Sequence, residues 1–173
     1  FEMNYLVAVV MGSDSDLLTL KPAVDLLQKF GISTEVRILS AHRTPHEMVA
    51  FAKEAQIRGI KVIIAGAGGA AHLPGMIASM SSLPVIGVPI QSNALSGVDS
   101  MLSILQMPRG IPVATVAIGG GLNAGLLALQ ILAAFDSSLA EDLATYRTSM
   151  YKEVIEKDRK LVELGPDAYL QDM

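Results

Sequence analysis

The chain has 173 residues, which is the length of a single domain. Hydrophobic residues make up 51% of the sequence and charged residues 17%, which excludes a disordered chain. The net charge of −4 argues against a nucleic-acid-binding surface, and the absence of cysteine excludes disulfides, iron–sulfur clusters, cysteine–zinc sites and thiol nucleophiles.

Short apolar segments alternate with longer amphipathic ones along the chain. Strands are predicted where these segments are β-branched and bounded by Gly or Pro, at Tyr5–Met11, Thr34–Leu39, Lys61–Ala65, Pro84–Val88 and Pro112–Ala117. Helices are predicted at Asp16–Phe30, Pro45–Arg58, Leu73–Met80, Ser100–Gln106, Asn123–Phe135 and Ser138–Leu161. Pro22 predicts a kink or a late start in the first helix, because proline lacks a backbone N–H.

This alternation predicts the α/β class, as a single three-layer α/β/α domain over residues 5–161. Its sheet is expected to be doubly wound, mainly parallel and five-stranded, in the manner of flavodoxin- or Rossmann-like folds, with a C-terminal helix added. A polar tail over residues 162–173 is expected to be extended from Gly165 onward. Ligands bind beyond the carboxyl ends of the strands in such folds, so the loops there are the candidates for chemistry.

Two long stretches, residues 62–98 and 110–135, contain no Asp, Glu, Lys or Arg. Glycine and proline interrupt both, so neither is expected to form a membrane span of about 20 apolar residues, and no membrane partner is expected. A domain of this size cannot bury so much uncharged sequence in its own core, which predicts a homo-oligomer. No signal peptide is visible, residues 1–4 are set aside, and a cytoplasmic location is expected because cysteine is absent.

The loop after the first predicted strand reads Gly12-Ser13-Asp14-Ser15-Asp16. Its backbone N–H groups, its serine hydroxyls and the following helix N-terminus can hold an anion such as a phosphate. Asp16 is better suited to accept hydrogen bonds from ribose hydroxyls. Two alternatives stay open: simple helix capping by Ser and Asp, and a Mg²⁺ site formed by Asp14 and Asp16.

A clear helix start follows the second predicted strand, in the segment SAHRTPHE over residues 40–47. Thr44 is a good N-cap, Pro45 suits the first helical position, and Glu47 stands where a capping box needs an acidic residue. This confines His42 and Arg43 to the short loop at the carboxyl end of the strand.

These two side chains suit a binding and catalytic role. Arg43 can donate two parallel hydrogen bonds to a phosphate, and His42 can gain or lose a proton near neutral pH. The alternatives are a structural role for His42 and a solvated surface role for Arg43.

The third predicted strand leads into the segment GAGGAAHLPG over residues 66–75. It matches the dinucleotide pattern G-x-G-x-x-A only weakly, since the acidic residue expected about 20 positions later is missing. Glycine and alanine instead let a ligand ring approach the backbone in an uncharged pocket. His72 is the one titratable residue in this segment, and a purely structural, hydrogen-bonded histidine is the alternative interpretation.

Taken together, the motifs GSDSD, SAHRTP and AGAGGAAHLPGM, followed by GVPIQSNALSGVDSMLSILQMPRGIPVATVAIG, closely resemble the PurE family of purine biosynthesis, in its bacterial class I form. The resemblance covers roughly Val7 to Phe135. It implies an isomerase that converts N5-carboxyaminoimidazole ribonucleotide to 4-carboxy-5-aminoimidazole ribonucleotide, a step in the synthesis of IMP. It also implies a homo-octamer, a small ribonucleotide as substrate, and no metal or other cofactor.

The resemblance carries over residue by residue. His42 matches the family's general acid/base, and the loop Gly68–Leu73 matches the segment around the transferred carboxyl group. The residues expected to bind substrate are Gly12, Ser13, Ser15, Asp16, Ser40, Ala41, Arg43, Gly68, Ala70, Ala71, His72 and Leu73. Leu17 departs from the tryptophan that is common in the family, and His46 stands where an acidic residue is common.

The expected chemistry needs a proton donor and a place to hold CO2. Protonation of the exocyclic nitrogen releases CO2, which must stay close until the ring carbon attacks it. We expect a small, dry, uncharged cavity walled by glycine and alanine, with His42 giving the first proton and taking the last. His72 is expected to shape this cavity. Two rivals are a class II enzyme that carboxylates aminoimidazole ribonucleotide directly, and a non-catalytic phosphate- or flavin-binding module.

Overall fold

The structure is a computed structural model that describes residues 6–173, so Tyr5, expected to begin the first strand and the domain, lies outside the described residues. The chain divides into two compact units, the first ending at Leu132 and the second running from Ala133 to Met173. The expected boundary between domain and tail at residue 161 stays a prediction, and the last long helix continues through it to Leu164.

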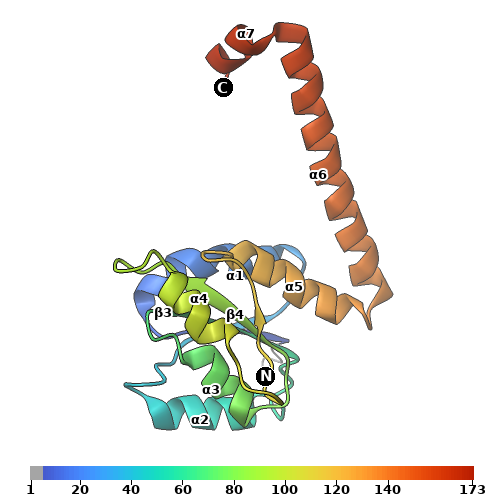
Figure 1. The fold of residues 1–173 in the computed structure, drawn as a ribbon. Helices are drawn as coiled ribbons and strands as arrows, with labels where there is room; N and C mark the ends of the chain where they lie inside the picture. The colour runs from blue at the N-terminus through green and yellow to red at the C-terminus, as the bar shows by residue number, and fades with distance from the viewer. Residues whose placement is uncertain (1–5) are drawn as a thin grey trace. The chain divides into compact units, whose positions relative to one another are not determined.

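The first unit is built on a five-stranded sheet in which every pair of neighbouring strands is parallel (Figure 1). The strand order is β2-β1-β3-β4-β5, so the predicted doubly wound parallel sheet is confirmed. The strands are β1 (Val7–Met11), β2 (Thr34–Ile38), β3 (Val62–Gly68), β4 (Val85–Ile90) and β5 (Ala114–Thr115).

Two strands differ in length from the prediction. β3 runs three residues further, to Gly68, because the Gly-Ala segment pairs with β4 through Gly68 and Ile90. β5 is only two residues long and pairs with β4 at Ala114 and Thr115. A short strand at the edge of the sheet also fits the proline at position 112, which has no N–H to donate.

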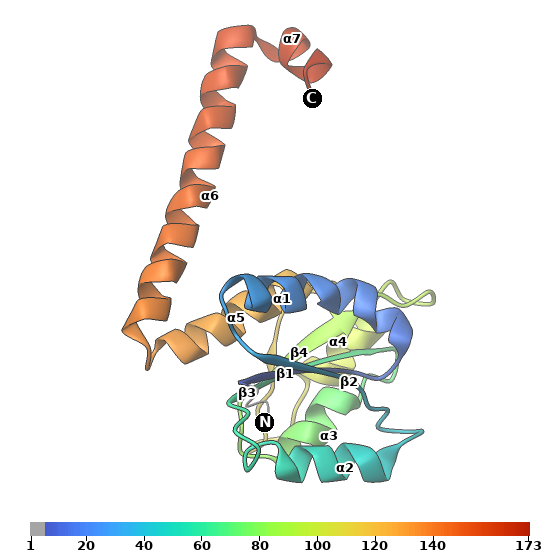
Figure 2. The ribbon, with the colours of Figure 1, turned by 180° about the vertical axis from the view of Figure 1, so that it is seen from behind.

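Helices cover both faces of the sheet (Figures 1 and 2). One face carries α1 and α5, and the other carries α2, α3 and α4. Their bounds are α1 (Leu17–Lys29), α2 (Pro45–Glu54), α3 (Leu73–Met80), α4 (Val98–Leu105) and α5 (Gly121–Ala133), with a 3₁₀ turn at Asp14–Asp16 before α1. Pro22 lies inside α1, so the predicted late start of that helix is wrong.

α1 and α5 approach each other closely at two glycines. A Cβ built on Gly121 would collide with the carbonyl oxygen of Thr19, and one built on Gly125 would lie 3.1 Å from the Cα of Ala23. The two helix backbones can therefore approach this closely only because α5 has no side chains at these positions.

The strand interiors form the core on both faces of the sheet. All five residues of β1 are buried, as a strand covered on two faces requires. On β3, Ile63 and Ala65 belong to the cluster that packs with α2, α3 and α4, whereas Gly66 faces Leu20 of α1. Because side chains alternate along a strand, Ile64 shares the face of Gly66.

The second unit consists of α6 (Ser137–Leu164) and α7 (Pro166–Gln171). Asp136 caps α6 by accepting the N–H of Leu139 at 3.1 Å. Gly165 ends α6 with a φ of +78°, and Pro166 occupies the first position of α7. The expectation of an extended tail from Gly165 is therefore wrong, because Pro166 starts a new helical turn.

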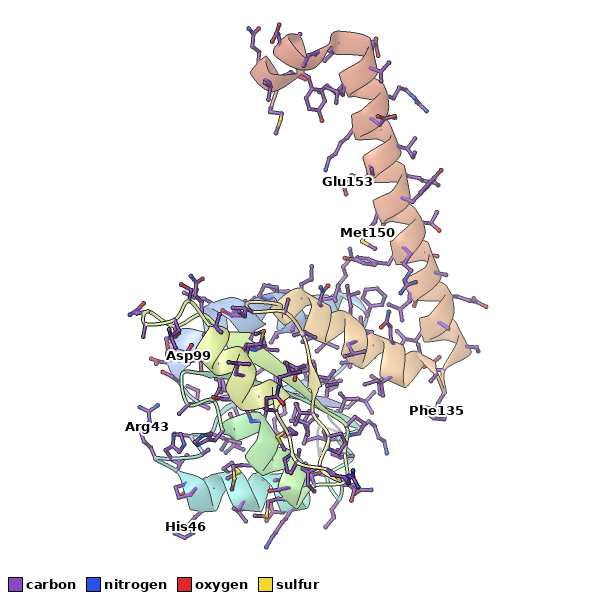
Figure 3. All side chains as sticks on the ribbon, viewed as in Figure 1. Arg43, His46, Asp99, Phe135, Met150 and Glu153 are labelled. Atoms are coloured by element: carbon purple, nitrogen blue, oxygen red, sulfur yellow. The ribbon has the colours of Figure 1, made fainter. Side chains whose placement is uncertain are left out.

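Exposed apolar side chains are frequent in the second unit, whose sticks are drawn in Figure 3. Phe135 is 94% exposed, and Tyr151, Val154 and Val162 on α6 are also largely exposed. Ion pairs such as Lys157–Glu153 and Arg159–Glu156 support the helix surface. Within residues 6–173, no helix is both long enough and apolar enough to span a bilayer.

Candidate functional site

Three loops meet at the carboxyl edge of the sheet, beyond β1, β2 and β3. β1 lies between β2 and β3, so the chain reverses its winding direction there, which is where open α/β sheets bind ligands. The loops border an open cavity of about 180 Å³. It is lined by Gly12, Ser13, Asp16, Ser40, Ala41, His42, Arg43, Ala67, Gly68, Ala70, His72 and Leu73.

The cavity lining includes every predicted site residue except Ser15 and Ala71, and it adds Ala67. The hydroxyl of Ser15 donates to the hydroxyl of Ser13 at 3.1 Å, and its N–H donates to Asp14 at 3.0 Å. Ala71 is buried in the hydrophobic cluster of the first unit. Ser15 therefore organises the first loop, and Ala71 anchors the third loop to the core.

Asp16 both caps the 3₁₀ turn before α1 and lines the cavity, so the capping and the ligand-binding alternatives are compatible. Its Oδ2 accepts the N–H of Ser13 at 3.2 Å, which is a capping bond, and the same carboxyl lines the cavity. Burial raises the pKa of Asp16 above its ordinary value. Hydrogen bonds from Ser13, Gly12 and Ser15 and the charge of Arg43 oppose that shift in part. Among residues 6–173, no three His, Asp or Glu side chains converge to hold a metal ion.

Arg43 is tied to the backbone of the first loop. Its Nη2 donates to the carbonyl oxygen of Gly12 at 2.9 Å, and its Nε donates to the hydroxyl of Ser40 at 3.4 Å. A second hollow of about 350 Å³ is lined by Arg43 together with residues that include Ser13 and Asp14. Arg43 lines both hollows, so its charge faces both of the spaces that the first loop borders.

The helix start after β2 is confirmed in position but not in its capping bond. Thr44 is the N-cap of α2 and Pro45 its first residue. The hydroxyl of Thr44 does not cap the helix, because it donates to the carbonyl oxygen of Ser40 at 3.2 Å and accepts the N–H of Ser40 at 2.9 Å. The expected capping box with Glu47 is therefore wrong, and the hydroxyl instead closes the loop that carries His42.

His42 and His72 form a direct contact at the cavity. Nε2 of His42 lies 2.8 Å from Nδ1 of His72, and the two rings are nearly perpendicular at 86°. A bond of this length holds one hydrogen, so one ring donates and the other accepts. His46 does not line the cavity and projects from α2 away from Arg43 (Figure 3).

The cavity is neither closed nor uncharged in this single chain. Both histidine rings are exposed, as are Gly68 and Ala70, and Arg43 and Asp16 contribute charge to the lining. The dry, uncharged space for CO2 beside the glycine–alanine loop stays a prediction, because it is expected in an oligomer with substrate bound. In this single chain the three loops line the cavity on one side and leave it open on the other.

Sequence analysis missed two serines of α4 that hold the third loop. The N–H of Gly69 donates to the hydroxyl of Ser100 at 2.9 Å, and the hydroxyl of Ser103 lies 3.2 Å from the carbonyl oxygen of Gly69 and 2.8 Å from that of Asp99. Nothing in the local sequence indicates these contacts, because they join residues 31 and 34 positions apart.

Comparison with known proteins gives a consistent result. A family model described as AIR carboxylase matches residues 6–153. The chain is 57% identical to an N5-carboxyaminoimidazole ribonucleotide mutase of Synechocystis, over 95% of this chain and 94% of that protein. A Pyrococcus horikoshii protein of the same name is 56% identical, over 96% and 94% of the two chains.

Two further similarities concern a longer protein and a solved structure. A phosphoribosylaminoimidazole carboxylase of Saccharomyces cerevisiae is 55% identical over 96% of this chain, which spans only 29% of that longer protein. The crystal structure of Treponema denticola PurE matches with a TM-score of 0.82 and 34% identity, over 90% of this chain and 98% of that one.

Proposed function

The chain belongs to the AIR carboxylase family, and we propose that it is the enzyme of purine biosynthesis that converts N5-carboxyaminoimidazole ribonucleotide to 4-carboxy-5-aminoimidazole ribonucleotide. Relatives more than 50% identical over nearly their whole length carry the name of this mutase. The observation that carries the proposed mechanism is the hydrogen-bonded pair of His42 and His72 at the edge of one cavity formed by three loops.

The three loops are proposed to bind three parts of the nucleotide. Arg43, together with Ser13 and the N–H groups of the first loop, binds the phosphate, because a guanidinium and backbone N–H groups are donors suited to it. Asp16 accepts hydrogen bonds from the ribose hydroxyls. Gly12 and Ser15 belong to the same phosphate-binding loop. The remaining substrate-binding proposals concern residues around the base, namely Ser40, Ala41, Gly68, Ala70, Ala71, His72 and Leu73.

His42 is proposed as the catalytic residue of an intramolecular carboxyl transfer. It donates a proton to the exocyclic nitrogen, the bond from that nitrogen to the carboxyl carbon breaks, and CO2 is released beside the ring. The ring carbon C4 then forms a bond to CO2, and His42 takes the proton that C4 loses. The proton that His42 takes from C4 replaces the proton that it gave to the exocyclic nitrogen, so the reaction needs no other reactant.

His72 is proposed to shape the cavity and to orient His42. Its Nδ1 contacts Nε2 of His42, so the ring of His72 restricts which tautomer His42 adopts. Retention of CO2 beside the nucleotide supplies most of the remaining acceleration, because two reactants held together react as one. No metal or nucleotide cofactor enters this scheme.

Replacement of His42 by asparagine tests the mechanism. We expect His42→Asn to bind nucleotide and to lose about 10²- to 10⁴-fold in kcat, the usual contribution of a general acid/base. His46→Asn is the matched control, because His46 is also exposed but does not line the cavity. Turnover of His42→Asn close to that of the unmodified enzyme would refute the assigned role.

Direct carboxylation of aminoimidazole ribonucleotide is the second candidate reaction. It is favoured by the name of the fungal relative, a carboxylase 55% identical to this chain. We expect fast turnover of N5-carboxyaminoimidazole ribonucleotide and slow turnover of aminoimidazole ribonucleotide with bicarbonate. The reverse order would assign the chain to the carboxylases.

We also propose that the enzyme is a homo-oligomer, an octamer as the sequence resemblance implies. Val98, Leu102 and Leu105 follow one helical stripe along α4 and are 45–49% exposed, and Leu95, in the turn before the helix, is 59% exposed. Such an exposed apolar stripe is expected to be covered by another subunit. Native mass spectrometry tests this, and a monomer at micromolar concentration would contradict it.

We propose a cytoplasmic location, which suits a chain without cysteine. Cell fractionation tests this proposal.

A further inference from the structure

We propose that Ser100 is a positioning residue for the reaction, because its buried hydroxyl fixes the third loop at Gly69. This inference rests on the proposed mutase reaction. The helix α4 contributes no residue to the cavity lining. In this proposal it instead holds in place the loop that forms the wall beside the retained CO2.

Ser100 makes two short hydrogen bonds inside the first unit. It is fully buried, its hydroxyl donates to the carbonyl oxygen of Ile90 at 2.6 Å, and the same oxygen accepts the N–H of Gly69 at 2.9 Å. One hydroxyl thus ties the turn after β3 to the last residue of β4. Gly69 has a φ of +67°, so the turn there depends on a conformation that a glycine adopts without strain.

The carbonyl side of Gly69 is held as well. Its oxygen accepts the N–H of Ala71 at 2.9 Å and lies 3.2 Å from the hydroxyl of Ser103, which shares its one hydrogen with the carbonyl oxygen of Asp99 at 2.8 Å. The N–H of His72 then donates to the carbonyl oxygen of Ala70 at 2.9 Å. This chain of bonds leads from α4 through Gly69 to the residue that contacts His42.

The position of Gly69 in the cavity wall makes this chain relevant to chemistry. Gly68, Ala70 and His72, on either side of it, line the cavity. After the carbon–nitrogen bond breaks, bound CO2 either reacts with C4 or escapes and leaves aminoimidazole ribonucleotide behind. A wall that moves favours escape, because recarboxylation requires CO2 and C4 to stay in contact.

Removal of the Ser100 hydroxyl is expected to change the outcome of each turnover. Ser100→Ala leaves the N–H of Gly69 and the carbonyl oxygen of Ile90 without their partner, and such groups carry a free-energy cost when buried. We expect the ratio of aminoimidazole ribonucleotide to carboxylated product to rise roughly tenfold, with little change in KM. A mutation that only lowers the folded fraction reduces both products equally.

The experiment uses the full-length oligomeric enzyme with N5-carboxyaminoimidazole ribonucleotide, and both products are quantified after subtraction of the enzyme-free reaction. Ser103→Ala, which removes a longer bond from a half-buried hydroxyl, is expected to raise the ratio less. Ser92→Ala is the matched control: its hydroxyl bonds Asp99 and the N–H of Gly97 near the start of α4 but does not contact Gly69. It is expected to behave as the unmodified enzyme.

Amide hydrogen exchange of the peptide that covers residues 67–73 gives a second readout, independent of activity. We expect exchange at Gly69 to be about tenfold faster in Ser100→Ala and unchanged in Ser92→Ala. An unchanged product ratio, unchanged exchange, or equal effects in Ser92→Ala would each overturn the role of Ser100. If unmodified enzyme forms no carboxylated product, the mutase reaction fails, and the exchange measurement still decides whether Ser100 holds the loop. If Ser100→Ala does not fold, Ser103→Ala decides by the same two measurements.

Discussion

The interiors of β1 and β3 and the loops that follow β1, β2 and β3 differ sharply, although they are continuous in the chain. Val9 and Ile64 have no exposed surface, whereas the rings of His42 and His72 are exposed. The strands contribute burial of apolar surface, and the loops contribute hydrogen bonds and charge. Stability and chemistry are therefore assigned to different residues of the same sheet, and variants can test that separation.

The largest effect is expected in a strand interior. Ile64→Ala should lower the free energy of unfolding by about 2–5 kcal/mol, because it leaves a cavity under α1. Ile57→Ala is the matched control, since Ile57 is 87% exposed, and its effect should stay within about 0.5 kcal/mol. Denaturant titration at one fixed protein concentration measures both. Equal losses would show that the assembled protein covers Ile57, and the comparison would fail.

A loop residue should show the opposite pattern. Arg43→Ala is expected to weaken binding of the ribonucleotide about 10- to 100-fold, which is what loss of hydrogen bonds to a charged group costs. Binding of the matching ribonucleoside, which lacks the phosphate, should change little, and the unfolding free energy should fall by no more than about 1 kcal/mol. Isothermal titration of both ligands checks the difference. Equal weakening of both would refute a phosphate role for Arg43.

Asp16 is an exception to the contrast between buried strands and exposed loops, because it lies after β1 and is also buried. Burial raises its pKa in the folded protein, so the favourable contribution of the protonated form is present at low pH and is lost as the pH rises through the folded pKa. Asp16→Asn removes this dependence, and its amide oxygen can still accept the N–H of Ser13.

The stability of the unmodified protein relative to Asp16→Asn should therefore fall as the pH rises from about 3 to about 7. Denaturant titrations at several pH values measure this smallest effect. A relative stability that rises over the same range would mean that the hydrogen bonds and Arg43 outweigh burial. Nucleotide binding by Asp16→Asn should also weaken near neutral pH, because an amide accepts hydrogen bonds from ribose less strongly than a carboxylate.

The sheet and the three loops were predictable because their signals are local. The start of α2 follows from Thr44 and Pro45, and the buried strands follow from their short β-branched runs. Parallel strands then bring the ends of β1, β2 and β3 to one edge, which places Asp16, His42 and His72 at one cavity.

The remaining features depend on contacts between distant residues or on competition for one group. The contact of His42 with His72 spans 30 residues, and the contact of Ser100 with Gly69 spans 31, so no local pattern indicates them. The Thr44 hydroxyl bonds Ser40 rather than its helix, a choice that sequence rules for capping do not resolve. The helix α7 is different, because Pro166 at its first position is a local signal, whereas the polarity of the tail indicates no particular structure.

The close approach of α1 and α5 has a consequence for how this gene tolerates change. A saturation library should return almost only glycine at position 121, where a Cβ would overlap the carbonyl oxygen of Thr19, and only the smallest residues at position 125, where a Cβ would lie 3.1 Å from Ala23. Leu122 and Asn123, between them and exposed, should accept most amino acids. Two permissive codons would then lie between restricted ones at the start of α5, and a map of permitted codons would report how closely the two helices pack.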